Sequence, residues 1–202
     1  MTGSGEETRE QRIQRLVAEE IAIVAYDPRW PQQFRAERDH LGSCLPRDVV
    51  RRIEHFGSTA VPGLAAKPIV DMLVEVSDLE AVEARVVPLL ESQGYDYLWR
   101  PTHGEDTPPF YAWFIKRDAA GRRTHHIHMV ERHFEHWDRL LFRDYLIEYP
   151  AVAREYARLK LGLAAELRHD RVGYTQRKTE FVLRTTQQAK LHYGQGSAGE
   201  RG

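Results

Sequence analysis

Residues 69–76 form the run IVDMLVEV, which is apolar almost throughout. A continuous apolar run of this length is typical of a strand that is buried on both faces and has neighbouring strands along both edges. Asp71 interrupts the run, and an ionised carboxylate among apolar side chains is costly unless it is paired or binds a metal. We therefore expect this strand at the centre of a layered sheet, with Asp71 either in a functional site or capping a neighbouring loop.

The spacing of apolar residues along the rest of the chain separates a strand-rich part from a helical part. Strand patterns occupy residues 21–26, 49–56, 95–100, 110–117 and 124–130; helical patterns occupy 8–21, the segment after Pro31, 77–92, 134–148, 150–168 and 173–192. This order predicts an α+β fold, with a mixed or antiparallel sheet flanked by helices and a C-terminal helical layer. The domain is expected over 21–192, after an N-terminal extension (1–20, partly disordered and then helical) and before a disordered tail (193–202).

Composition excludes several function classes. The 202 residues suit one hydrophobic core, and 29 Lys+Arg against 30 Asp+Glu leave no basic field for nucleic acid. The apolar runs are far shorter than the ~18 residues of a membrane span, and the acidic start does not resemble a secretory signal. The single cysteine, Cys44, excludes an internal disulfide and predicts a cytoplasmic location. The 8–21 helix would pack on its own domain or on a second copy, so a homodimer remains open.

The segment HFGSTAVPGLAAKP, residues 55–68, is rich in small residues. A Gly57-Ser58 turn directly after a strand lets backbone N–H groups and a hydroxyl approach a phosphate, because few side chains block the way. Lys67 adds a positive charge nearby. The alternative, given equal weight on these residues alone, is an ordinary Gly-Ser turn.

The strand pattern THHIHMV, residues 124–130, carries the second set of candidates. Alternation puts His126 and His128 on one face, about 7 Å apart at ~3.3 Å per residue. Two such imidazoles can converge on one metal or one anion. Apolar neighbours indicate a partly buried strand, which favours a site over the alternative of a solvated histidine pair.

The C-terminal helices carry further cations. Arg143, Lys160 and Lys178 are candidates for binding the negative charge of a ligand. Tyr156 with Lys160, and Tyr174 with Lys178, share helix faces at i, i+4. A solvated helix surface is the more common role for any one of these residues.

Several separated motifs resemble the GrpB-like family of bacterial proteins. They are IEHFGSTAVPGLAAKPIVDMLVEV (53–76), YDPRWPQQF (26–34), THHIHMV (124–130) and LLFRDYLIEYPAVAREYARLKLGLA (140–164). The resemblance covers about residues 22–190. It implies a fold of the nucleotidyltransferase type, for a family whose general activity is not established and whose members also occur fused to dephospho-CoA kinases.

In the wider nucleotidyltransferase superfamily a Gly-Ser turn holds the triphosphate and an Asp-x-Asp/Glu pair binds divalent metal. The resemblance assigns the turn to Gly57 and Ser58 and the first carboxylate to Asp71, but the second carboxylate position is Leu73. One carboxylate cannot anchor two metal ions. Three interpretations stay open: the histidines complete a one-metal site, the histidines act without metal, or the pocket only binds its ligand.

The hypothesis from the sequence is an enzyme that acts on a nucleotide or another phosphorylated small molecule. Asp71, His126 and His128 are the expected catalytic residues and the ligands of one divalent metal, Mg, Mn or Zn. The expected phosphate-binding residues are Gly57, Ser58, Thr59, Lys67, Arg143, Lys160 and Lys178. The alternative is a non-catalytic nucleotide- or phosphate-binding regulatory module. A polymerase-like enzyme is disfavoured, because duplex binding needs a dense basic patch.

Overall fold

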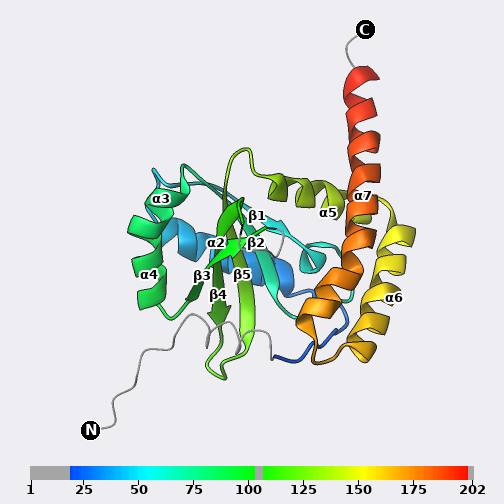
Figure 1. Cartoon of the computed structure of the whole chain (residues 1–202), viewed down its shortest axis with the longest axis horizontal. Coiled ribbons are helices and arrows are strands. Elements are labelled where there is room, and N and C mark those ends of the chain that lie inside the picture. Colours follow the sequence, from blue (N-terminus) through cyan, green and yellow to red (C-terminus); the bar gives the residue numbers. More distant parts are fainter. Residues whose placement is uncertain (1–18, 103–106, 200–202) are drawn as a thin grey trace.

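A computed structural model of the chain describes residues 19–102 and 107–199 and is built on one five-stranded sheet (Figure 1). The strands are β1 (Val50–Phe56), β2 (Val70–Val76), β3 (Asp96–Pro101), β4 (Phe110–Arg117) and β5 (Arg123–Glu131), in the order β1-β2-β5-β4-β3. Strands β2 and β5 run parallel, whereas the other neighbouring pairs are antiparallel. The predicted α+β class with a mixed sheet is therefore confirmed.

Strand β2 lies inside the sheet and packs on both faces, as its apolar run predicts. Met72 and Val74 belong to the core cluster on one face, and Leu73 belongs to a separate cluster on the other face. The parallel register with β5 sets Asp71 opposite His126 and Leu73 opposite His128. Because side chains alternate along a strand, this register fixes which face of the sheet carries the polar residues.

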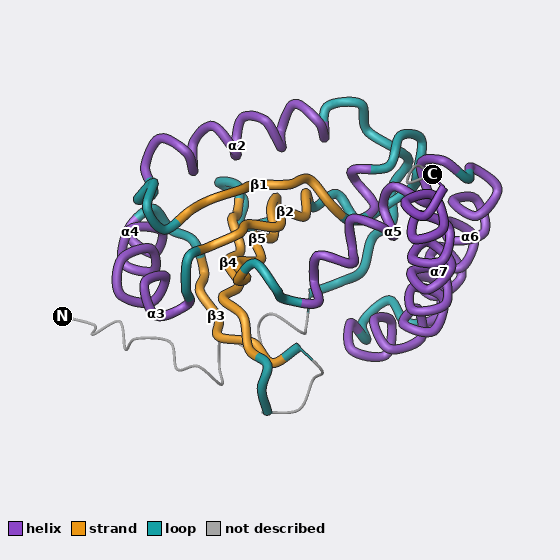
Figure 2. The backbone as a smooth tube through the Cα atoms, turned by 90° about the horizontal axis from the view of Figure 1, so that it is seen from above, coloured by secondary structure: helices purple, strands orange, loops and turns teal. Residues whose placement is uncertain are grey.

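Helices form a layer on each face of the sheet (Figure 2). They are α2 (Trp30–Cys44), α3 (Leu79–Ala81), a π-helical turn (Val82–Val86), α4 (Val87–Ser92), α5 (Asp138–Glu148), α6 (Pro150–Glu166) and α7 (Arg171–Gly199). Apolar residues of α2, α3 and α4 pack into the first core cluster, and Leu140 of α5 packs into the second. Helices α6 and α7 pack against α5 in a third cluster, which forms the expected C-terminal helical layer.

The predicted helix over 77–92 is present, but it is interrupted. Asp78 caps its start, because its Oδ1 accepts a hydrogen bond from the Ala81 backbone N–H at 2.6 Å. The π-helical turn precedes Pro88, which has no N–H to continue the α-helical hydrogen-bond pattern. Gly94 ends the segment with a φ of 85°, a conformation that favours glycine.

Two segments differ from the sequence predictions. The strand predicted over 21–26 is wrong: Val24 makes one isolated bridge to Ala66, and the Ile21 backbone N–H binds the carbonyl of Arg168. This apolar segment joins loops and the C-terminal helices instead of the sheet. Helix α7 continues to Gly199, past the predicted end at 192. The helix predicted over 8–21 falls almost wholly outside the described residues, as do residues 200–202.

None of the helices in the described ranges combines the length and apolar character needed to cross a bilayer.

The substitution Leu73→Ala tests whether β2 is buried at the centre of the sheet. Leu73 is 0% exposed, so Leu73→Ala leaves a cavity between the sheet and α5 and should lower the free energy of unfolding by about 2–5 kcal/mol. Leu183→Ala is the matched control, because Leu183 is 65% exposed and its loss should change stability by less than about 0.5 kcal/mol. Urea unfolding measures both values, and equal losses would contradict the assigned layers.

Candidate functional site

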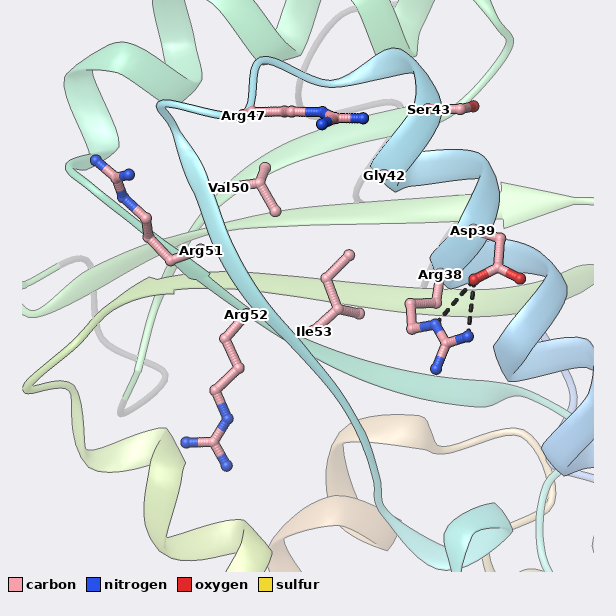
Figure 3. Close-up of a pocket in the computed structure, with 9 residues that line it drawn as sticks. All are labelled: Arg38, Asp39, Gly42, Ser43, Arg47, Val50, Arg51, Arg52 and Ile53. Atoms are coloured by element: carbon pink, nitrogen blue, oxygen red, sulfur yellow. Dashed lines mark hydrogen bonds and ion pairs between the residues drawn. The ribbon is translucent and has the colours of Figure 1, made fainter.

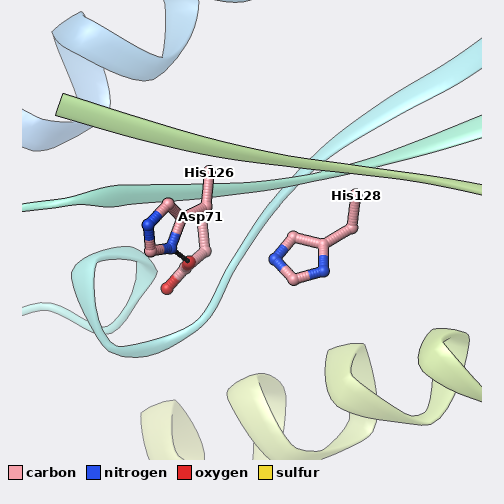
Figure 4. Close-up of side chains that lie close together, drawn as sticks. All are labelled: Asp71, His126 and His128. Atoms are coloured by element: carbon pink, nitrogen blue, oxygen red, sulfur yellow. Dashed lines mark hydrogen bonds and ion pairs between the residues drawn. The ribbon is translucent and has the colours of Figure 1, made fainter. Parts of the chain in front are cut away.

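Asp71 on β2 and two histidines on β5 gather on the face of the sheet that α5 covers (Figure 4). The Oδ1 atom of Asp71 lies 3.3 Å from Nδ1 of His126. One ligand atom from each of Asp71, His126 and His128 lies within 4.8 Å of the other two. Asp71 keeps 29% of its side chain exposed, so the cluster is reached by solvent from one side. The structure thus brings together the three residues that the sequence selected.

Both histidines are neutral near pH 7. Burial lowers the pKa of His126 to about 4, although the hydrogen bond with Asp71 opposes the shift. Burial also holds the pKa of His128 well below its ordinary value, and the charge of Arg139 adds to that effect. The His128 ring stacks on Tyr111 with centroids 5.4 Å apart, and its buried Nδ1 has no hydrogen-bond partner among the described residues. A neutral imidazole with a free nitrogen is suited to bind a ligand or metal.

The turn after β1 closes directly over Asp71. Gly57 has a φ of 73° and a ψ of -171°, a region that only glycine adopts readily. A Cβ at this position would lie 2.5 Å from Oδ2 of Asp71. Gly57 is therefore required twice, for the backbone conformation and for the approach of the turn to the carboxylate.

Ser58 and Thr59 follow in a short 3-10 helix (Ser58–Ala60) and have different surroundings. The Ser58 hydroxyl accepts a hydrogen bond from the Lys160 amine at 2.9 Å. Thr59 is buried, and its Oγ1 lies 3.0 Å from Nε2 of His55. The predicted phosphate ligand Thr59 thus supports the turn from inside, whereas Ser58 lies at its surface.

Lys67 and Lys178 flank one aromatic ring next to the cluster. Each amine lies 5.2 Å from the ring centroid of Tyr174. Burial lowers the pKa of Lys67 to about 7, and the charge of Lys178 contributes to that shift. Burial lowers the pKa of Lys178 as well, while the charge of Asp71 opposes the shift. Burial and mutual repulsion make the charged forms of these lysines unfavourable in free energy. Such an arrangement is expected where an anion binds.

The charge around Asp71 is strongly unbalanced. Burial alone would raise the pKa of Asp71, but the hydrogen bond from His126 and the charges of Lys67 and Lys178 outweigh burial and lower it. The charges of Lys160 and Arg139 also interact with this carboxylate. Within residues 19–102 and 107–199, the side chains of Lys67, Arg139 and Lys178 make neither a hydrogen bond nor an ion pair. Four basic side chains thus surround Asp71, and the charge of Glu135 also acts on Arg139, which leaves an excess of positive charge.

Arg143, which the sequence selected, has other partners. Its guanidinium contacts Glu54 at 3.5 Å, Asp144 at 2.6 Å and the carbonyl oxygen of His55 at 2.7 Å. It therefore anchors α5 to β1 instead of joining the cations around Asp71. Sequence reasoning missed Arg139, which precedes Arg143 by one helical turn; the i, i+4 spacing was the available signal.

A hollow of about 550 Å³ lies between α2 and the first half of β1 (Figure 3). Its lining residues are Arg38, Asp39, Gly42, Ser43, Arg47, Val50, Arg51, Arg52 and Ile53. Arg38 is paired with Asp39 and Arg52 with Glu54, each at 2.8 Å, and both arginines are well exposed. Solvent screens such charges, so the Asp71 cluster is the stronger candidate.

The chain has relatives among known proteins. Residues 20–188 match the family model described as GrpB protein, so the chain belongs to the GrpB family. It is 36% identical over 171 residues to UPF0157 protein YqkA of Bacillus subtilis. This alignment covers 84% of this chain and 47% of YqkA. It is 35% identical over 164 residues to glutamate-rich protein GrpB of Alkalihalophilus pseudofirmus, covering 81% of this chain and 92% of that protein. The chain thus spans about half the length of YqkA.

A solved structure supports the same assignment. The crystal structure of GrpB from Enterococcus faecalis aligns with a TM-score of 0.73 at 33% identity, covering 85% of this chain and 99% of that chain. The similarity to a structure of the Cid1 poly(U) polymerase is weaker, with a TM-score of 0.45 at 16% identity over 69% of this chain and 41% of that chain.

Gly57→Ala tests the close approach of the turn to Asp71. The new Cβ collides with Oδ2 of Asp71 and the backbone becomes strained, so we expect a loss of stability above the ~1–2 kcal/mol of a left-handed alanine. Gly63→Ala is the control, because Gly63 has a φ of 77° but nothing within 4 Å of its Cβ position. Urea unfolding compares the two variants, and equal destabilisation would show that the contact with Asp71 contributes nothing.

Proposed function

We propose that this GrpB-family protein binds a nucleotide or another phosphorylated small molecule at the Asp71 cluster and catalyses a metal-assisted reaction at its phosphate. The observation that carries the proposal is the charge imbalance around Asp71, where four basic side chains surround this carboxylate. Partly buried positive charge without a counter-ion is costly, and a phosphate ligand removes that cost.

The cations have the chemistry that phosphate requires. The amines of Lys67, Lys160 and Lys178 and the guanidinium of Arg139 lie on three elements and a loop that surround Asp71. The pKa of Lys67 is lowered to about 7, so a phosphate would draw a proton onto this amine as it binds. Charge-assisted hydrogen bonds to phosphate are about twice as strong as neutral ones.

The donor set of Asp71, His126 and His128 fits one divalent metal. Two neutral imidazoles and a carboxylate suit zinc or manganese better than magnesium, which prefers an all-oxygen shell. The unpartnered Nδ1 of His128 agrees with a ligand role. Such a metal would supply Lewis-acid polarisation of a phosphoryl oxygen.

Metal and phosphate should bind cooperatively. The four cations repel a dication, and a phosphate between them screens that repulsion. By thermodynamic linkage each ligand then raises the affinity of the other. Asp71 and the two histidines would hold the metal, while Lys67, Lys178 and Arg139 would orient the phosphate and exclude water from its far side.

Lys178→Met tests the phosphate-binding role. Loss of one charge-assisted hydrogen bond costs about 1.5–3 kcal/mol, so Kd for ATP with Mn²⁺ should rise roughly 10- to 150-fold by calorimetry. Lys190→Met is the control on the same helix, since Lys190 pairs with Asp138 at 2.5 Å and lies outside the cluster. Equal affinities of the two variants would contradict the proposal.

The same samples, assayed for release of pyrophosphate or phosphate from each nucleoside triphosphate, separate an enzyme from a binding module. Turnover that Lys178→Met weakens supports the enzyme. Binding without turnover of any nucleotide would leave the phosphate site but remove the catalytic part of the proposal.

The Asp71→Asn variant distinguishes metal binding from phosphate binding. The amide is nearly the same size but cannot act as an anionic ligand, so binding of Mn²⁺ or Zn²⁺ should be lost. Binding of inorganic phosphate without metal should be kept or strengthened, because the carboxylate that acts on all four basic side chains is gone. Glu75→Gln on the same strand is the control and should change neither. Loss of phosphate binding in folded Asp71→Asn protein would contradict this assignment.

A further inference from the structure

Ser58 and Lys160 form a hydrogen-bonded pair at the edge of the proposed phosphate site. The Nζ atom of Lys160 lies 2.9 Å from Oγ of Ser58. Lys160 is only 2% exposed, whereas Ser58 is half-buried. Ser58 therefore keeps part of its surface open to solvent, while the amine behind it is shielded from water.

The other contacts of Lys160 suit a neutral amine. Its Nζ donates a hydrogen bond to the carbonyl oxygen of Ala65 at 2.5 Å and lies 4.7 Å from the ring centroid of Tyr156. It has no carboxylate partner among the described residues. A neutral amine has two N–H groups and one lone pair, so it can donate to Ala65 and accept the Ser58 proton at the same time.

Burial and the charge of Lys178 favour the neutral form of Lys160. Burial lowers the pKa of Lys160 to about 7, the charge of Lys178 on α7 lowers it further, and Asp71 on β2 opposes the shift. Tyr156, one turn earlier on α6, stays neutral because burial raises its pKa. A substantial fraction of the amine is thus unprotonated at neutral pH.

We propose that Ser58 is a nucleophile, with Lys160 as its general base, and that the pair attacks the phosphorus of the ligand bound beside Asp71. This inference rests on the proposed function, because it takes its substrate from the same site. The Ser58 Oγ–P bond forms as the bond from phosphorus to its leaving group breaks, and the Ser58 proton moves to Nζ of Lys160. The leaving group departs with the bonding electron pair and takes the proton back from Lys160.

A purely structural role for Lys160 is the competing explanation, because the same two hydrogen bonds fix the 58–65 loop to α6. Lys160→Arg distinguishes the two roles. Arginine keeps the positive charge and the donors, but it cannot be deprotonated at any pH at which the protein is folded. It should therefore preserve phosphate binding and lose the activation of Ser58.

The test is labelling of the full chain with a fluorophosphonate, which carries its own leaving group. Attack by Ser58 forms the Oγ–P bond and releases fluoride, and Lys160 takes the proton. We expect one labelled serine, mapped to Ser58 by peptide mass spectrometry, with a rate that increases through about pH 7. Ser58→Ala should abolish labelling, and Lys160→Arg should slow it at least tenfold.

Circular dichroism and calorimetry with inorganic phosphate, on the same samples, separate the outcomes. A folded wild-type protein without labelled Ser58, or a Lys160→Arg variant labelled at the wild-type rate, overturns the nucleophile assignment even if phosphate binds. Labelling of Ser58 without any phosphate binding instead overturns the proposed function. If Lys160→Arg is unfolded, the pH dependence of wild-type labelling decides: a flat profile between pH 6 and 9 refutes Lys160 as base.

Discussion

The parallel pairing of β2 with β5 is the constraint on which the site depends. It joins two segments more than fifty residues apart and sets Asp71 opposite His126 and Leu73 opposite His128. A slip of one residue in this register would send the histidines to the other face, where Ile127 and Met129 pack in the core. The apolar side chains of β2 thus determine the face on which the polar cluster lies, because burial of Met72 and Val74 on one face forces Asp71 onto the other.

Much of this arrangement could be predicted from the sequence. The apolar run over 69–76 identified the central strand, and alternation in THHIHMV put His126 and His128 on one face. The proximity of Asp71 to those histidines was an expectation based partly on family resemblance, since strand order is not readable from periodicity. The failures have physical reasons: residues 21–26 have strand composition, but they pair with a loop at Ala66 and pack on the C-terminal helices. Arg143 looked equivalent to other cations until its contact with Glu54 was visible.

The sequence resemblance implied a motif with two carboxylates, and this chain has only the first of them, Asp71. Where a second acid would stand, Leu73 packs in the cluster beneath α5, and the adjacent position on β5 is filled by His128. The site therefore has less negative charge than a site with two carboxylates, and the lysines and Arg139 make it positive. Such a site favours an anionic ligand over a pair of bare metal ions. Gly57 completes it by bringing the serine turn against the carboxylate.

The central claim is that the positive site beside Asp71 holds phosphate. The most direct measurement is a crystal structure of the protein soaked with phosphate and Mn²⁺, with anomalous data collected to locate the metal. The account predicts phosphate between Gly57, Lys178 and Arg139, with manganese on Asp71, His126 and His128. Phosphate bound only in the arginine-lined hollow along β1, with the Asp71 cluster left without either ligand, would contradict it.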